Sequence, residues 1–406
     1  MKILLTDGHQ RSALAVTRSI GRAGMEVWVG ESEEKNLSAS SKYCRKAIVY
    51  PSPYEDEEGF LEAIKNLVGK EKWDMVIPIS DITSAILSEN KKELERFTTV
   101  ATADPEIYWA ASDKNNLHRL AEELGVPTPT LNYIEKPQQI PDVLGKISFP
   151  CVLKPARSRL RLSGRWIPTS VKRIESKDDL IKFLQEDSGK TGPFMIQKEI
   201  HGEGQGVFAL CDRGEPKAWF AHRRLREKPP WGGVSTLRES VALDPQLKEY
   251  AERLLRRLRW HGVAMVEFKR ETGTGVPYLM EINGRFWGSL QLAIDAGIDF
   301  PLLLVQLYKG DTVRPQSDYR VGIRSRWFLG DVDHLLGRLS RRGRSTPDAP
   351  SIGALLMDFM KFNRKDTYYE VESWSDPGPS LYEITRYLSE GVKGLMDSIR
   401  GTRHGG

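Results

Sequence analysis

The sequence predicts an α/β protein that begins with an open parallel sheet, and two patterns support this. Over the first hundred or so residues, short apolar runs alternate with amphipathic stretches, as parallel strands joined by crossover helices require. Between His261 and Arg285, two further apolar runs flank a glycine-containing turn, which is typical of an antiparallel hairpin. With 406 residues, the chain is long enough for two or three domains with separate cores.

The N-terminal sheet is predicted element by element. Strands are expected at 2–6, 26–30, 47–50, 74–80 and 99–103, and helices at 12–24, at 60–69 and from near Asp81. Ligands of such sheets usually lie at the carboxyl ends of strands, where Gly8 and the pair Ser80 and Asp81 fall. Alternatively, Gly8 only forms a turn and Asp81 only caps a helix. The turn DGHQRS lacks the GxGxxG pattern, so no dinucleotide site is expected.

Composition narrows the class of protein. A hydrophobic content of 39% and a charged content of 28% are typical of soluble globular proteins. No apolar run approaches the roughly 20 residues that span a membrane, and the first residues turn polar too soon for a secretory signal. Cys44, Cys151 and Cys211 lie far apart, so we expect reduced thiols and a cytoplasmic location. A net charge of +5 favours nucleotide-handling enzymes over dedicated nucleic-acid binders.

The predicted hairpin carries the candidate metal ligands. If its strands pair about Thr274, Glu267 lies directly opposite Glu281, and Asn283 shares their face. Two opposed carboxylates repel unless a cation lies between them, and an all-oxygen set favours Mg²⁺, with Mn²⁺ as second candidate. Arg285 follows with a guanidinium suited to phosphate or carboxylate. The alternative is an ordinary hairpin whose acidic face points to water.

The E…ExNxR pattern of this hairpin resembles the metal-binding end of the ATP-grasp superfamily, which includes biotin carboxylase, D-alanine–D-alanine ligase and carbamoyl-phosphate synthetase. The resemblance implies bound ATP and Mg²⁺. It also implies an N-terminal α/β domain at 1–110 and an ATP-grasp domain of two subdomains at 111–310. Of these, the small nucleotide-covering subdomain falls at about 125–195. The remaining residues, 311–406, form a small helical C-terminal extension whose role stays open.

Two lysines fall where the family contacts nucleotide phosphate. Ser112 is the predicted N-cap of a helix whose first turn contains Lys114, an unfavourable place for a cation unless an anion binds there. Lys154 ends an apolar strand in a Lys-Pro pair. The glycine-rich phosphate loop of the family is replaced by residues 156–170, which contain Gly164, Arg157, Arg159, Arg161 and Arg165. The arginines either replace some backbone contacts or form a mobile basic loop.

The stretch PFMIQKEIHGEGQG resembles the nucleotide hinge of the family. The resemblance implies that the backbone around Lys198 and Ile200 meets the adenine edge. The side chain of Gln197 or Lys198 would make further contacts, and Glu203 would lie near the ribose. Alternatively, these glycines only form a bulged turn.

A basic strand supplies the remaining candidates. His222, Arg224 and Arg226 alternate along one strand face, and three potential cations together favour a bound anion. The alternative is a solvated basic edge strand. With the EINGRFWG stretch, this passage is similar to D-aspartate-ligase-like carboxylate–amine ligases.

The resemblance implies an ATP-dependent ligase that joins a small carboxylate to an amine, such as an amino acid, through an acyl phosphate. Its catalytic residues would be Arg285, Arg224, Arg226 and His222. A carboxylase-like enzyme and a non-catalytic ATP-binding regulatory protein remain alternatives, and a homodimer is left open. Neither a membrane nor a nucleic acid is expected as a partner. Beyond residue 310, the sequence predicts only a basic linker at 337–351 and an amphipathic helix at 381–399.

Overall fold

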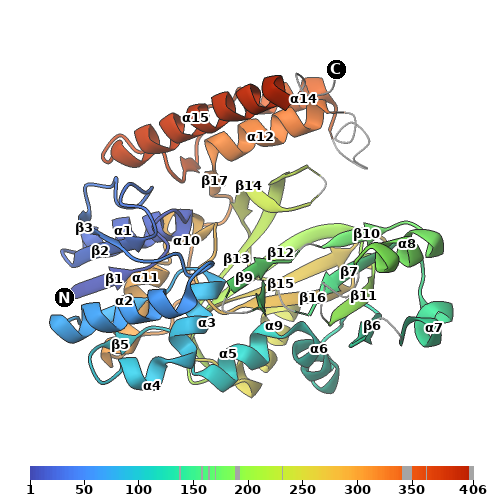
Figure 1. The fold of residues 1–406 in the computed structure, drawn as a ribbon, viewed down its shortest axis with the longest axis horizontal. Coiled ribbons are helices and arrows are strands. Elements are labelled where there is room, and N and C mark those ends of the chain that lie inside the picture. The colour runs from blue at the N-terminus through green and yellow to red at the C-terminus, as the bar shows by residue number, and fades with distance from the viewer. Residues whose placement is uncertain are drawn as a thin grey trace.

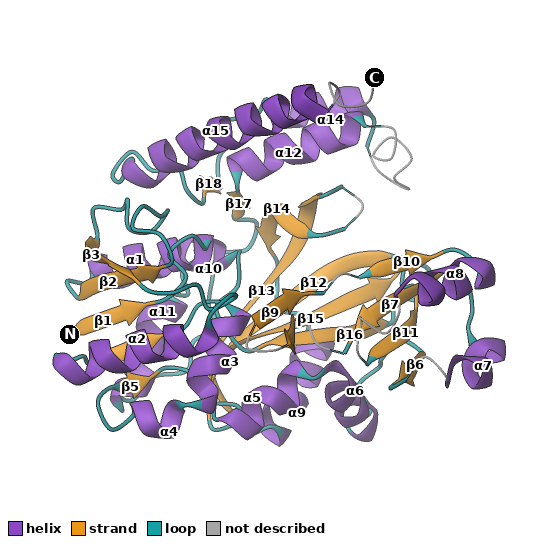
Figure 2. Ribbon diagram, in the orientation of Figure 1, coloured by secondary structure: helices purple, strands orange, loops and turns teal. Residues whose placement is uncertain are grey.

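A computed structural model gives the fold of the chain (Figure 1). It describes residues 1–136, 139–156, 159–162, 165–169, 171–187, 193–230, 232–340, 350–362 and 364–401. Three main sheets follow one another along the sequence, and a helical layer at the top of Figure 2 contains the C-terminal helices. The predicted α/β class is therefore confirmed.

The N-terminal sheet is parallel throughout and has the order β3-β2-β1-β4-β5. Its strands are β1 (Lys2–Leu5), β2 (Glu26–Glu31), β3 (Cys44–Val49), β4 (Met75–Ile77) and β5 (Thr99–Val100). The helices are α1 (Arg11–Arg22), α2 (Glu57–Lys70), α3 (Asp81–Glu89), α4 (Lys91–Leu94) and α5 (Pro105–Ser112). Every residue of β4 is buried, as expected for a strand of a parallel sheet covered on both faces.

The helix starts near the site differ from the predicted ones in one case. Ser80 caps α3 in a capping box with Thr83, so Asp81 is the first helical residue and its carboxylate is free of capping. Ser112 was predicted to cap the next helix, α6 (Lys114–Glu123), and this is wrong. Ser112 ends α5, while the Asp113 carboxylate accepts hydrogen bonds from the amides of the following turn. Both residue types are good caps, so the sequence did not distinguish them.

The second sheet is small and antiparallel, with the order β10-β7-β11-β6. Its strands are β6 (Leu131–Ile134), β7 (Cys151–Pro155), β10 (Lys172–Ile174) and β11 (Phe194–Lys198), and it carries α7 (Ile140–Val143), η2 (Leu144–Lys146) and α8 (Lys177–Asp187). Between β7 and β10, where the family has a glycine-rich loop, β8 (Arg159–Leu162) and β9 (Arg165–Pro168) pair as a hairpin. Arg157 and Gly164 lie outside the described residues.

The third sheet has seven strands in the order β16-β15-β12-β13-β14-β17-β18. It contains β12 (Gly202–Asp212), β13 (Glu215–Lys228), β14 (Val234–Ser240), β15 (Gly262–Glu271) and β16 (Pro277–Asn283), with α9 (Pro245–Arg257), α10 (Leu290–Ala296) and α11 (Phe300–Lys309). Helices α5 and α6 pack against β16. The N-terminal domain and this sheet share one hydrophobic cluster, which reaches from Phe60 to Leu279.

The C-terminal part is not only helical, because β17 (Arg324–Arg326) and β18 (Thr367–Tyr369) extend the seven-stranded sheet. Its helices are α12 (Phe328–Leu339), α14 (Ile352–Phe359) and α15 (Gly378–Gly401), of which the last contains the predicted helix at 381–399. Most of the predicted basic linker, 341–349, lies outside the described residues. Buried ion pairs of Arg18 with Asp376 and of Arg238 with Glu370 fasten this part to the rest.

In the described part of the chain, no single helix is long and apolar enough to cross a membrane. Only α10 and α11 taken together meet that criterion, with a bend of 94° between them.

Candidate active site

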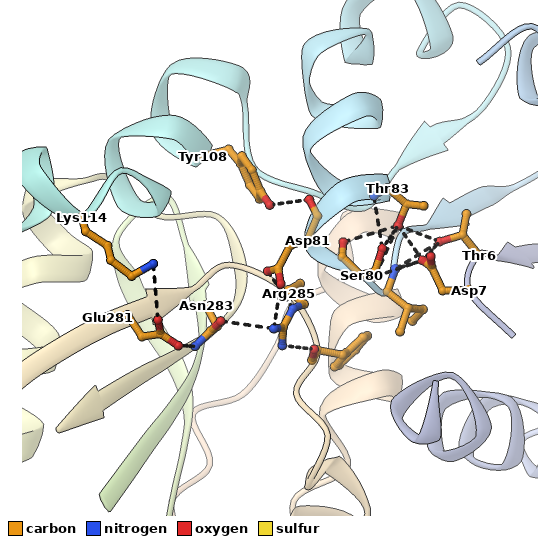
Figure 3. Close-up of polar contacts among 12 residues, drawn as sticks. Thr6, Asp7, Ser80, Asp81, Thr83, Tyr108, Lys114, Glu281, Asn283 and Arg285 are labelled. Atoms are coloured by element: carbon orange, nitrogen blue, oxygen red, sulfur yellow. Dashed lines mark hydrogen bonds and ion pairs between the residues drawn. The ribbon is translucent and has the colours of Figure 1, made fainter. Parts of the chain in front are cut away.

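The two carboxylates predicted to oppose each other do so. In the antiparallel pair of β15 and β16, Glu267 is the direct partner of Glu281, and Asn283 is the partner of Met265. The amide nitrogen of Asn283 donates a hydrogen bond to Glu281 Oε1 at 2.9 Å (Figure 3). The register follows from strand alternation on either side of a short turn, and a bulge after Glu267 increases the local twist.

Each carboxylate has its own cation. Arg224 Nη2 lies 2.6 Å from Glu267 Oε2, and Lys114 Nζ lies 3.8 Å from Glu281 Oε2. Burial raises the pKa of Glu267, with a further contribution from the charge of Glu281, although Arg224 opposes both. Burial alone would also raise the pKa of Glu281, but Lys114 and the Asn283 amide hold it below its ordinary value. The site is thus an array of alternating charges rather than a solvated acidic face.

The oxygen atoms of this array fit a hard cation that is also bound by a ligand. Among the described residues, no three His, Cys, Asp or Glu side chains gather into a metal site built by the protein alone. Glu267, Glu281 and Asn283 offer two carboxylates and one amide oxygen. Such a partial set is typical of Mg²⁺, which keeps several positions for phosphate oxygens and water.

Two lysines from different elements reach this array. Lys114 is buried at the start of α6, and its backbone N–H donates to the carbonyl of Ala156 just after β7. The ammonium of Lys154 lies 4.0 Å from Met280 Sδ, on the strand that carries Glu281. Burial lowers the pKa of Lys154, with the charge of Glu281 opposing that shift. Within the described residues, no carboxylate lies at ion-pair distance from Lys154, so an incoming anion meets an available ammonium.

A buried histidine next to these lysines was missed in the sequence. His118 lies one turn after Lys114 on α6, is only 1% exposed, and neither ring nitrogen has a hydrogen-bond partner among the described residues. Burial, together with the charges of Lys154 and Lys114, lowers its pKa to about 4. Its helical spacing from Lys114 was a usable signal, because residues four apart share a helix face.

Arg285 is held by a residue of the N-terminal domain. Its Nε and Nη2 donate to the two carboxylate oxygens of Asp81 at 2.8 and 3.0 Å, and Nη2 also donates to Asn283 Oδ1 at 3.2 Å. The hydroxyl of Tyr108 in turn donates to the backbone carbonyl of Asp81 at 2.8 Å (Figure 3). Asp81 therefore does more than begin a helix, and it connects the sheet end predicted to bind ligands with the acidic hairpin.

The predicted cationic trio on β13 is reduced to a pair. His222 is 2% exposed, its ring centroid lies 4.6 Å from that of Phe208, and its Nε2 lies 2.7 Å from Ser289 Oγ. Burial and the nearby Arg238 lower its pKa well below the ordinary value, so it is neutral and not a third cation. The alternation predicted neither this aromatic core nor the register irregularity that follows Arg224.

The two arginines of this strand have different partners. Arg224 bridges Glu267 and Glu227, whereas a register irregularity between Arg224 and Arg226 turns the latter toward the C-terminal part. There Arg226 Nε lies 3.2 Å from Asp331 Oδ1 on α12.

The hinge residues lie together around the end of β11. Gln197 and Ile200 are buried, whereas Lys198 is exposed and pairs with Glu271 at 2.9 Å. Glu203 is exposed at the start of β12, with Arg223 Nη1 at 3.9 Å. The Nε2 atom of Gln197 has no hydrogen-bond partner in the described part of the chain. A buried amide nitrogen without a hydrogen-bond partner is suited to donate to an acceptor atom of a ligand.

The arginine-rich hairpin folds onto the N-terminal domain. Trp166 is buried, its backbone N–H donates to the carbonyl of Tyr54, and its indole donates to Glu57 at 2.9 Å. Arg161 pairs with the same Glu57 and with Glu89. Trp166 thereby covers a cavity of about 40 Å³ that also touches Lys114, Glu281 and Asp81. This closure was not predicted from the sequence, where the segment was only a basic loop.

Comparisons with known proteins give similarities in sequence over part of the chain. Residues 190–328 match the family model described as "ATP-grasp in the biosynthetic pathway with Ter operon". The carbamoyl phosphate synthase large chain of Methanosarcina barkeri is 24% identical over 239 residues, which is 55% of this chain but only 22% of that protein. The chain thus spans about a fifth of the length of this curated relative.

Solved structures share the fold at low identity. The biotin carboxylase of Campylobacter jejuni, in complex with β,γ-ATP, has a TM-score of 0.62 and 19% identity, covering 80% of this chain and 74% of that one. The L-amino acid ligase of Bacillus licheniformis has a TM-score of 0.60 and 16% identity, covering 78% of both chains. The chain therefore shares the fold of these structures, and its residues 190–328 match an ATP-grasp family model.

Proposed function

We propose that the protein is an ATP-dependent carboxylate–amine ligase, which forms an amide through an acyl phosphate and releases ADP and phosphate. The observation that carries the proposal is the charge array of the hairpin. Two opposed carboxylates, Glu267 and Glu281, each face a cation from a different element, and Arg285 stands two residues beyond Asn283. Such an array neutralises a polyphosphate and its metal while holding an attacking carboxylate in place.

ATP-grasp enzymes in general use ATP and Mg²⁺, and the residues of this chain fit both. Glu267, Glu281 and Asn283 would hold the metal, which supplies charge neutralisation at the phosphates when bound. Lys114 and Lys154 would contact the phosphates, while Gln197, Lys198, Ile200 and Glu203 would surround the adenosine.

The proposed reaction has two displacement steps. An oxygen of the substrate carboxylate attacks the γ-phosphorus in line, and the bond to the ADP oxygen breaks. The nitrogen of an uncharged amine then attacks the acyl carbon, phosphate leaves, and the amine proton passes to solvent or buffer. Arg285 and Arg224 place fixed positive charge beside the two anions during the first step, because their carboxylate partners hold each guanidinium in position. Arg226 and His222 support them from the same strand, Arg226 by charge and His222 as a neutral packed ring.

Screening pools of carboxylic acids and amino acids for ADP release tests the proposal. A ligase releases ADP only when both a carboxylate and an amine are present, and the product contains a new amide. ADP release that depends on bicarbonate and needs no amine would replace it with a carboxylase, as in the structurally similar biotin carboxylase. Nucleotide binding without turnover in any pool would favour a regulatory ATP-binding protein.

A further inference from the structure

A large cavity lies between the seven-stranded sheet and the C-terminal part. It measures about 640 Å³, within the range of small-molecule sites. One wall comes from β12 and β13 and includes Gly204, Arg224 and Arg226. The opposite wall comes from α12, α14 and the segment after it, including Arg338, Ala354 and Arg364.

This cavity adjoins the candidate active site through one side chain. Arg224 lines the cavity, and its Nη2 lies 2.6 Å from the Glu267 carboxylate. A molecule whose reacting carboxylate lies near Arg285 and Glu281 can therefore extend past Arg224 into the cavity. The cavity does not reach Lys114 or Lys154, so it is separate from the proposed phosphate contacts.

The lining of the cavity is rich in guanidinium groups. Five arginines line it, against the three carboxylates of Glu203, Glu227 and Asp358; the arginines are Arg224, Arg226, Arg324, Arg338 and Arg364. On the C-terminal side, the single carboxylate of Asp358 is shared by Arg364 at 3.3 Å, Lys361 at 3.5 Å and Arg226 at 3.8 Å. Asp331 pairs with Arg226 and also with Arg326. Two carboxylates thus face four cations in this region, which keeps an excess of positive charge.

Arg226 in particular has hydrogen-bonding capacity left over. Its side chain is 9% exposed, and its Nη1 has no hydrogen-bond partner among the described residues. Burial lowers the pKa of this arginine, with Asp331 opposing the shift. A buried donor without a partner is costly. Since Arg226 lines the cavity, an oxyanion there would lie beside a guanidinium whose pairing is incomplete.

Most of the second wall lies outside the segment that matches the family model. Residues such as Arg338, Ala354, Asp358 and Arg364 lie beyond the segment 190–328 that matches the family model. The C-terminal part, whose role the sequence left open, thus adds a basic wall beside a common catalytic centre.

We infer that the C-terminal part completes a substrate pocket for a small molecule with a second oxyanion, a carboxylate or phosphate group remote from the reacting carboxylate. This inference rests on the proposed ligase function and specifies its substrate class. Planar guanidinium groups match carboxylate and phosphate equally well, so the shared chemistry is the oxyanion. The volume of about 640 Å³ suits a small metabolite.

Direct binding to the nucleotide-free full-length protein tests the inference. At low ionic strength, calorimetry compares tricarballylate, a tricarboxylate, with inorganic phosphate and with butyrate, a monocarboxylate. We expect at least one of the first two to bind at least about tenfold more tightly than butyrate. Tighter tricarballylate binding indicates a polycarboxylate substrate, and tighter phosphate binding indicates a phosphorylated one.

Three variants locate the binding. Arg364→Gln removes one cation of the second wall, and Ala354→Trp fills the cavity from α14; each should weaken the preferred anion at least about tenfold. Arg256→Gln is the matched control, because Arg256 is an exposed arginine of α9 that does not line the cavity. It pairs with Glu252 on the same helix and with Glu215 at the start of β13. Unchanged melting temperatures show that the variants are folded.

Butyrate binding as tightly as both polyanions, or equal binding by all variants, would overturn the inference. Because anion binding is measured without turnover, its result does not depend on the result of the ligase assay. Arginine-dependent anion binding without ADP release would retain the pocket and reject the ligase. Amide formation that neither Arg364→Gln nor Ala354→Trp alters would retain the ligase and reject the pocket.

Discussion

Asp81 and Arg285, 204 residues apart in the sequence, form a two-pronged ion pair between the N-terminal domain and the acidic hairpin. Burial alone would lower the pKa of Arg285, but the Asp81 carboxylate raises it above its ordinary value. The guanidinium is thereby held beside Asn283 with a fixed orientation. The N-terminal domain consequently contributes to the site by orienting its arginine.

Replacing Arg285 by lysine should leave ATP binding nearly unchanged and reduce amide formation by about 100-fold. A lysine keeps the charge but cannot make the two parallel hydrogen bonds to Asp81 that fix the position of the cation. Calorimetry with ATP and steady-state rates of ADP release measure the two effects. Ligation within about threefold of the wild type would show that no guanidinium clamp operates.

Asp81→Asn examines the positioning half of the same pair. The side chain keeps its size but loses the charge that orients Arg285, so we expect the turnover number to fall about tenfold with little change in the Michaelis constant for ATP. Partial recovery in Asp81→Glu distinguishes positioning from a general packing defect. An equal loss in both variants, accompanied by a lower melting temperature, would make Asp81 merely structural.

Replacing Glu281 by glutamine should reduce Mg²⁺-dependent turnover by about 100-fold, because one of the two opposed carboxylates loses its charge. The fold should persist, since the side chain keeps its shape and the hydrogen bond to Asn283. Glu249→Gln provides the control, because it removes an exposed carboxylate of α9 that pairs with Arg253 of that helix. Near-normal activity at every Mg²⁺ concentration would remove Glu281 from the metal site.

Replacing Lys154 by methionine should weaken ATP binding roughly tenfold or more, while AMP binding changes by less than about threefold. AMP lacks the distal phosphates that this ammonium is proposed to reach. Methionine fits the local packing, because the ammonium already lies against Met280 Sδ. Equal losses for both nucleotides would indicate that Lys154 is a structural residue.

His118 should make the protein acid-sensitive. Its folded pKa of about 4 lies below the ordinary value of 6.5, so between these values the unfolded chain binds more protons. Stability therefore falls as the pH is lowered, by about 2 kcal/mol between pH 7 and pH 5 from this residue alone. His118→Leu should abolish that part of the loss, as measured by urea unfolding at both pH values.

The exposed histidine His201 supplies the control for this series. His201→Gln should leave the difference in stability between pH 7 and pH 5 as it is in the wild type. If His118→Leu loses as much stability as the wild type over this interval, the buried ring is not the source.

Sequence patterns predicted the hairpin register because strand alternation and a short symmetrical turn are local properties. They also predicted the parallel sheet, whose buried apolar strands and crossover helices follow in order. The pairing of Asp81 with Arg285 depends on how two domains pack, so no local pattern indicates it. Burial of His222 likewise depends on Phe208 of the neighbouring strand, and alternation within one strand does not predict that contact.

The segments without a family pattern were the least predictable. Residues 156–170 suggested a basic loop, yet Trp166 anchors a hairpin to Glu57 of the N-terminal domain. Arg338, which falls in the predicted linker at 337–351, belongs to α12 and lines the cavity, because α12 and α14 pack beside the sheet in a way that no local pattern indicates.

The most direct test of the central claim follows the phosphate during carboxylate-dependent turnover. With a carboxylate that supports amide formation, hydroxylamine supplied in place of the amine should yield a hydroxamate together with stoichiometric ADP and inorganic phosphate. That result is expected when an acyl phosphate forms beside Arg285 and the Glu267–Glu281 pair. Release of AMP and pyrophosphate with the same substrate would contradict the account and require an adenylating mechanism instead.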